Sequence, residues 1–428
     1  MFKTPYLLLA TCLLLSACDS GSSASNGYTP PDLSDLKSYR TDSDYAEALA
    51  VCPGLYQRDR VCTIGELPPL EVDSSDIPTV DEIMSRVSVS HDWMGARFEQ
   101  ALNLLPSEIR TLSKPLAAIV IDDDVRPSFF LSSSGTIYLD PKYLWLTQAE
   151  KDTISDHEDF RGAYATQMTT LPAWRYVDNG NYAYSSNDAT SRTEEDMVQS
   201  LARLLFHELA HANDFIETNR LASLSSEAGF HQLINPEGGQ MSDYVQSGLP
   251  LTSETLLDYA AALYLGLTAS VQTTSLRGSL AGASLESEGA NATYAYTTRY
   301  EDFAMLVEET MMQRHYGFQR DTAFIEQEVI GVDSQGDEIT EVVVKWGQRG
   351  RIGDALVKPR AQTAMEQLLP EIDWATHFSN LAAPDHLTVG DTWAENLSLS
   401  NDFAVELSSD ERARNASLDT EDFANPHY

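Results

Sequence analysis

The chain has 428 residues, of which 65 are Asp or Glu and 28 are Lys or Arg, giving a formal net charge of −37 at pH 7. A surface this acidic repels nucleic acid and anionic lipid headgroups, which argues against either as a partner. The length is too great for one minimal hydrophobic core and indicates one large domain with appendages, or two domains.

Residues 1–17 have the pattern of an export signal. Lys3 supplies a positive start, and residues 6–15 include an apolar stretch that is too short to span a bilayer as a helix. The small residues before Cys18 are similar to the cleavage site of bacterial lipoproteins, and this resemblance implies that Cys18 becomes the lipidated first residue of the mature chain. The alternative is an ordinary cleaved signal peptide with an incidental thiol at Cys18.

Residues 18–35 are rich in Gly, Ser, Asn and Pro, a composition typical of a flexible tether. No later segment of the sequence approaches the length of a transmembrane helix. We therefore expect the protein in the bacterial cell envelope, facing the periplasm or the cell surface. The lipid on Cys18 would then be its contact with the membrane.

The remaining cysteines predict a disulfide. If Cys12 is removed with the signal and Cys18 carries lipid, only Cys52 and Cys62 are left. Two cysteines ten positions apart in an exported chain favour a disulfide, which would stabilise the fold by roughly 2–3 kcal/mol. The alternative is a pair of buried free thiols. We expect residues 36–70 to form a small N-terminal module that contains this bond.

The segment that follows predicts a helical region and then strands. Residues 80–113 carry apolar side chains at helical spacing. Residues 116–121 are a short run rich in β-branched side chains, and residues 136–139 follow a turn at Ser134-Gly135, so both are expected to be strands. Residues 151–196 are polar and aromatic, and we expect loops with short helices there.

The sequence His207-Glu208-Leu209-Ala210-His211 ends an apolar run with helical spacing. On a helix, two histidines four positions apart project from one face, so both imidazoles can bind one zinc ion. Glu208 then lies beside the metal, where it can take a proton from a zinc-bound water. The pattern is typical of a zinc-dependent hydrolase, usually a peptidase. The alternative is an ordinary helix with two incidental histidines.

A catalytic zinc ion needs three protein ligands and an open position for water. The metzincin pattern requires a glycine and a histidine where this chain has Asp214 and Glu217. A thermolysin-like arrangement needs a glutamate on a helix about twenty residues beyond His211, where this chain is rich in Ser, Gly and Pro. Both arrangements are therefore disfavoured. Asp214 remains a candidate for accepting a hydrogen bond from a ligand imidazole.

Two further helices are predicted, over residues 253–267 and 298–315. The second of them is a better source of the third ligand. Glu301 and Glu308 lie on one face of it, beside an apolar stripe. Glu301 would complete a His-His-Glu zinc site, whereas Glu308 would be the alternative ligand or would orient one. The other possibility for both is a solvated acidic helix face.

The C-terminal part predicts a hairpin and a helix. Residues 328–332 and 341–346 are β-branched runs on either side of a turn-rich segment, which indicates a β-hairpin. A helix is expected near residues 359–370. The last forty or so residues are acidic and poor in apolar side chains, and we expect them to be largely irregular.

Two motifs carry a resemblance to a known family: His207-Glu208-x-x-His211-Ala212-x-Asp214 and Glu301-x-Phe303-Ala304. They resemble those of the anthrax lethal factor type of gluzincin, which also includes the Pro-Pro endopeptidases. The resemblance covers these motifs and extends at most over residues 115–315. It implies that Glu301 is the third zinc ligand and that Tyr294, seven residues earlier, stabilises the oxyanion. Tyr296 and Tyr300 also precede Glu301 and are alternative donors to that oxyanion, and the other possibility for each of the three tyrosines is ordinary aromatic packing.

The chain departs from the family pattern at two positions. Ala210 stands where the family commonly has glycine, and Met305 stands where it has a second glutamate. These differences concern substrate specificity more than metal binding.

The expected fold class is α+β. A zincin-like catalytic domain over residues 71–320 would combine a small sheet, the active-site helix and the second, glutamate-bearing helix, preceded by the disulfide module over residues 36–70. A C-terminal extension over residues 321–428 would contain the hairpin and the acidic tail. An edge strand of the catalytic sheet would pair with an extended substrate.

The expected function is that of a zinc metallopeptidase with one catalytic Zn²⁺ ion, acting on a peptide or protein substrate. Glu208 would be the general base and His207, His211 and Glu301 the ligands. The alternative is a catalytically idle zincin-fold lipoprotein that serves as a binding or assembly module of the envelope. Hydrolysis of a non-peptide amide is a further possibility, because the same zinc-water chemistry serves both reactions.

Overall fold

The computed structural model describes residues 29–399 except for 59, 75–76, 158, 186–188, 235–237 and 333–337. The predicted signal peptide, Cys18, most of the tether and the acidic tail from residue 400 onward lie outside the described residues. The described part is a mixed α+β fold with two small sheets. None of its helices is long and apolar enough to cross a membrane.

The chain divides into two compact units, and each unit takes two separate stretches of sequence. Unit 1 consists of Met1–Phe160 and Tyr184–Gln240, and unit 2 consists of Arg161–Ala183 and Met241–Tyr428. The chain therefore leaves unit 1 for a short segment, returns to it, and leaves it again. The domain limits expected from the sequence stay predictions.

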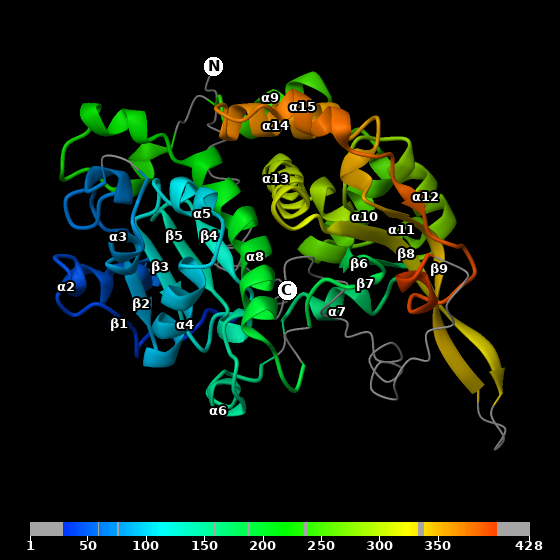
Figure 1. Cartoon of the computed structure of the whole chain (residues 1–428), viewed down its shortest axis with the longest axis horizontal. Helices are drawn as coiled ribbons and strands as arrows, with labels where there is room; N and C mark the ends of the chain where they lie inside the picture. Colours follow the sequence, from blue (N-terminus) through cyan, green and yellow to red (C-terminus); the bar gives the residue numbers. More distant parts are fainter. Residues whose placement is uncertain are drawn as a thin grey trace. The chain divides into compact units, whose positions relative to one another are not determined.

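The sheet of unit 1 has the strand order β1-β2-β3-β5-β4 (Figure 1). Its three central strands run parallel, while the edge strands β1 and β4 are antiparallel to their neighbours. The residues of the central strands are buried throughout, which is the pattern of a parallel sheet covered on both faces. The strands are β1 (Lys37–Ser38), β2 (Val87–Val89), β3 (Ala118–Ile121), β4 (Phe129–Leu131) and β5 (Thr136–Leu139).

One long helix, α8 (Glu194–Phe215), contacts β4 of this sheet and the helices α4 and α5 (Figure 1). Because most of its side chains are buried, it is part of the core of unit 1 rather than a surface helix. The other α-helices of the unit are α2 (Ala46–Leu49), α3 (Val80–Met84), α4 (Asp92–Leu102), α5 (Ser107–Leu112) and α6 (Gln148–Lys151).

The predicted disulfide between Cys52 and Cys62 is confirmed. Both cysteines are buried, and Cys52 begins a 3-10 turn that extends to Arg58. The hydroxyl of Tyr138, on the central strand β5, donates a hydrogen bond of 2.6 Å to the carbonyl of Pro53. The disulfide loop is therefore attached directly to the sheet of unit 1.

The sheet of unit 2 is antiparallel throughout, in the order β10-β9-β8-β6-β7. Its centre is the long hairpin of β8 and β9, and β6 pairs with the first half of β8. The hairpin predicted around residue 335 is confirmed and is longer than expected. The strands are β6 (Leu171–Asp178), β7 (Asn181–Tyr182), β8 (Gln319–Val332), β9 (Glu338–Arg349) and β10 (Asp385–His386).

Helices supply the rest of the core of unit 2. The helices α10 and α12 pack around Phe324 and Trp346 of the hairpin, while α13 contacts α9 and α14. The helices predicted near residues 253–267, 298–315 and 359–370 are confirmed as α10, α13 and α14. The helices are α7 (Gly162–Ala165), α9 (Met241–Gly248), α10 (Glu254–Leu265), α11 (Val271–Thr274), α12 (Gly278–Glu286), α13 (Arg299–Tyr316), α14 (Lys358–Leu368) and α15 (Trp374–Asn380).

Two sequence predictions were wrong in part. The region 80–113 contains the central strand β2 between its helices, because a three-residue strand is too short to interrupt a helical pattern. The region 151–196 contains β6, whose eight residues include Pro172 and Arg175 and so do not form a simple apolar alternation. The strands β3 and β5 are confirmed, and they pair in parallel rather than as a hairpin.

Candidate metal centre

The histidine-bearing helix α8 begins at a well-defined cap. The Thr193 hydroxyl accepts a hydrogen bond from the Asp196 N–H, and the Asp196 carboxylate accepts one from the Thr193 N–H. The helix then runs for 22 residues, so that His207 and His211 lie in its second half, one turn apart. The predicted helical spacing of the two histidines is therefore present in the structure.

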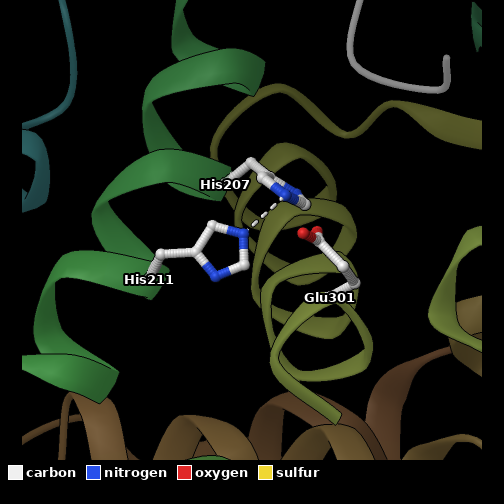
Figure 2. Close-up of side chains that lie close together, drawn as sticks. All are labelled: His207, His211 and Glu301. Carbon is white, nitrogen blue, oxygen red and sulfur yellow. Dashed lines mark hydrogen bonds between the residues drawn. The ribbon is translucent and has the colours of Figure 1, made fainter. Parts of the chain in front are cut away.

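The two imidazoles point toward each other. The Nε2 atoms of His207 and His211 are 3.1 Å apart and the ring centroids 4.8 Å apart (Figure 2). This separation fits a hydrogen bond in which one ring donates its N–H to the other. It also fits two ligands of one tetrahedral zinc ion, whose nitrogen atoms would be about 3.3 Å apart for Zn–N bonds of about 2.05 Å. The pair can therefore receive a metal with little rearrangement.

The polar face of α8 is buried. His207 is 1% exposed, Glu208 3%, His211 8% and Asp214 3%. Buried ionisable side chains in proteins are normally paired or bound to metal, so a buried helix with four of them favours a site over incidental composition. The predicted roles of Glu208 as general base and of Asp214 beside a ligand imidazole remain predictions.

Glu301 occupies the first turn of α13. Thr298 is the N-cap residue of this helix, and its hydroxyl accepts a hydrogen bond of 3.1 Å from the Glu301 N–H. Thr-x-x-Glu is the sequence of a capping box, in which the glutamate side chain bonds back to the backbone of the cap residue. In α13 that return bond is not formed, and the Glu301 carboxylate does not serve as part of the cap.

Other helices of the described chain do complete this box. Their third residue, Glu or Asp, bonds back to the threonine that caps the helix, as in α3 (Thr79 and Glu82), α6 (Thr147 and Glu150) and α8 (Thr193 and Asp196). The same sequence pattern thus gives a closed box three times and an open one at Glu301.

The three predicted ligands form a group that could hold a metal ion. One ligand atom from each of His207, His211 and Glu301 can be chosen so that all three lie within 4.8 Å of one another. Figure 2 shows the Glu301 carboxylate turned toward the two imidazoles. Among the described residues, this is the group of His, Cys, Asp and Glu side chains that fits a metal ion.

Glu308, the alternative ligand, is not part of this group. It is fully buried in unit 2, where it accepts a hydrogen bond of 3.0 Å from the Tyr176 hydroxyl. Tyr176 is on β6, so Glu308 connects α13 to the sheet of its own unit. This contact favours a structural role for Glu308 over that of a ligand.

The candidate tyrosines Tyr294 and Tyr300 have different surroundings. The ring of Tyr294 lies 4.9 Å from that of Tyr264, centroid to centroid, at nearly a right angle. The Tyr300 hydroxyl accepts a hydrogen bond of 2.7 Å from Arg299, which also forms an ion pair of 2.9 Å with Asp243. Burial raises the pKa of Tyr264, so its phenol stays protonated. The assignment of the oxyanion group to Tyr294 remains a prediction.

The structure also shows buried polar contacts of α13 that the sequence did not reveal. Asp302 pairs with Arg360, and Glu309 accepts a hydrogen bond of 2.8 Å from Asn291. Burial raises the pKa of Asp302, and Arg360 opposes that rise. Asp302 and Arg360 are 58 positions apart, and no local pattern links them.

Comparison with protein-family models, with curated proteins and with solved structures gave no match to this chain. The function is therefore argued from the donor atoms, their burial and the helices that carry them.

Proposed function

We propose that this protein is a zinc-dependent peptidase of the gluzincin type, with His207, His211 and Glu301 as the zinc ligands. The observation that supports this most is the convergence of the three ligand atoms to within 4.8 Å of one another. The pair of histidines one turn apart on a buried helix gives further support.

The donor set fits zinc better than it fits the other common divalent cations. Two imidazole nitrogens and one carboxylate oxygen are the ligands of many catalytic zinc sites, at distances of about 2.0–2.2 Å. Calcium and magnesium prefer shells made of oxygen atoms. Three protein ligands leave a fourth position for water, which is what a hydrolytic site requires. Bound there, zinc supplies Lewis-acid activation of that water.

In the proposed mechanism Glu208 moves the proton. Its carboxylate belongs to the residue directly after a proposed ligand and is buried, which supports a role in accepting a proton from the attacking water and returning it to the leaving amine. The Tyr294 hydroxyl would donate a hydrogen bond to the oxyanion, with its ring held against Tyr264. The zincin-like domain and the likeness to the lethal factor and Pro-Pro endopeptidase type belong to this proposal.

The proposed setting is the bacterial cell envelope, with a peptide or protein as substrate and the lipid on Cys18 as the membrane anchor. Because the chain is strongly acidic, its own charge would repel an anionic membrane, which is consistent with a lipid as the anchor.

The substitution Glu208→Gln tests the mechanism. Because glutamine keeps the shape but cannot accept the proton, we expect zinc content to be unchanged and peptide cleavage to fall by at least about 100-fold. Zinc is measured by elemental analysis, and cleavage is measured on a peptide library. Glu195→Gln is the matched control, since Glu195 is an exposed residue of the first turn of α8.

Equal cleavage by the wild type and Glu208→Gln would contradict the mechanism. A wild-type protein that binds no zinc would contradict the metal centre itself. A wild type that binds zinc and cleaves nothing in the library would favour the binding or assembly lipoprotein instead.

A further inference from the structure

We propose that the buried pair of Asp302 and Arg360 positions Glu301 for metal binding, an inference that rests on the proposed metal centre. Asp302 directly follows Glu301 in the first turn of α13, and Arg360 lies on α14. Both Nη atoms of Arg360 donate hydrogen bonds to Asp302: Nη1 at 2.8 Å to one carboxylate oxygen, and Nη2 to the other. Such a two-point contact fixes direction as well as distance.

Arg360 is itself held rigidly. Its Nε donates a hydrogen bond of 2.7 Å to the Leu249 carbonyl, and its Nη1 donates one of 3.0 Å to the Gly289 carbonyl. The side chains of Arg360 and Asp302 are 2% and 1% exposed. The guanidinium therefore joins α13, α14 and two loop carbonyls, and a rotation of the first turn of α13 would break the two buried hydrogen bonds between Asp302 and Arg360.

The geometry of a helix explains why this matters for Glu301. A side-chain tip lies about 6 Å from the helix axis, so a rotation of the first turn by about 10° moves it by about 1 Å. Metal–ligand distances in functional sites hold to about 0.2 Å. A contact that prevents small rotations of this turn is thus directly relevant to a ligand on it.

The middle of α13 has separate anchors. Glu308 is bonded to Tyr176, and Glu309 accepts hydrogen bonds from Asn291 and from the Ile352 N–H at 3.0 Å. These contacts lie about two turns from Glu301 and hold the body of the helix. The first turn is held by the Thr298 cap and by the Asp302–Arg360 pair.

A buried ion pair is weak evidence for stability. Replacing both partners by apolar side chains of similar volume is often neutral or stabilising, whereas removing one partner costs several kcal/mol. The double variant Asp302→Leu/Arg360→Met therefore separates positioning from folding. We expect it to fold, with an unfolding midpoint close to that of the wild type, and to bind zinc roughly tenfold more weakly.

Zinc affinity is measured on the full chain by competition with a chelator. The matched control is Arg126→Met/Asp140→Leu, which replaces a pair of similar burial in unit 1, with side chains 3% and 2% exposed. We expect this control to keep the wild-type zinc affinity.

A thermodynamic cycle with Glu301→Ala gives the decisive comparison. If the pair acts through Glu301, removing it in the Glu301→Ala background causes no further loss of zinc affinity. The same tenfold loss in both backgrounds, or no loss in the wild-type background, would overturn the positioning role while leaving the metal centre intact. Absence of zinc binding by the wild type would overturn both.

If the double variant does not fold, Arg360→Lys provides a second test of whether the pair positions Glu301. Lysine keeps the charge but loses the two-point contact with Asp302. We expect Arg360→Lys to lose less zinc affinity than the double variant, and to cause no loss in the Glu301→Ala background. A zinc affinity of Arg360→Lys equal to that of the wild type would contradict the inference.

Discussion

Asp122 is a buried acid at the end of β3, and it is only 1% exposed. Burial raises its pKa to about 7, and the nearby carboxylates of Asp123 and Asp124 add to the rise. The next two residues of the chain face histidines: His91 lies 3.6 Å from Asp123, and His157 lies 3.4 Å from Asp124. Because the folded state binds this proton more tightly than the unfolded chain, Asp122 favours folding at low pH.

We predict that Asp122→Asn changes how stability depends on pH. The contribution of Asp122 is fully present below its unfolded pKa of about 4 and is lost as the pH rises through about 7. The unfolding free energy of the variant minus that of the wild type should therefore rise by about 2–3 kcal/mol from pH 5 to pH 8. Urea unfolding at both values measures this, with the exposed Asp42→Asn as control. A difference that does not change with pH would contradict the assignment.

At the scale of the element, the cap of α8 decides where the histidine helix begins. Thr193→Ala removes the hydroxyl that accepts from the Asp196 N–H, and we expect a loss of about 1 kcal/mol in the free energy of unfolding. Thr193→Ser keeps a hydroxyl and should retain most of that stability. Thermal unfolding of both variants measures the difference, and equal midpoints for the two would show that the cap contributes little.

The helices that carry the candidate ligands were predictable because their signals are local. Thr193 and Thr298 are cap residues, and the apolar spacing that follows each of them is helical over several turns. The strands β2 and β6 were not predictable, because one is very short and the other is completed by β8, far along the chain. The parallel pairing of β3 and β5 is likewise a tertiary property.

In the candidate site, too, the features with a local sequence signal were predictable and the long-range contacts were not. The spacing of His207 and His211 indicates a shared helix face, and only the family resemblance singled out Glu301 over Glu308. The partners that hold Glu308 and Asp302, Tyr176 and Arg360, lie far from them in sequence and gave no local signal. The buried contact with Tyr176 favours a structural role for Glu308, and the choice of Glu301 over Glu308 as the ligand stays a prediction.

For the whole molecule, the disulfide is a stability element of unit 1. It closes a loop with a sequence separation of 10, and we expect Cys52→Ala/Cys62→Ala to lower the free energy of unfolding by about 2–3 kcal/mol. Denaturant unfolding with and without reductant measures the effect. Reductant should destabilise the wild type by a similar amount and leave the double variant unchanged, and equal sensitivity of both proteins would contradict the prediction.

The interleaved order of the two units has a consequence for biosynthesis. The segment Arg161–Ala183 is made between the two parts of unit 1, yet its strand β6 pairs with β8 of unit 2. Thr170 and Ile325, joined by a hydrogen bond, are 155 positions apart. At a synthesis rate of about 5–20 residues per second, the residues of β6 are made roughly 8–30 s before those of their partner strand. During this time the β6 segment lacks its partner strand, which exposes the newly made chain to aggregation. A fragment ending at residue 240 would lack β8 altogether, so we expect it to remain prone to aggregation.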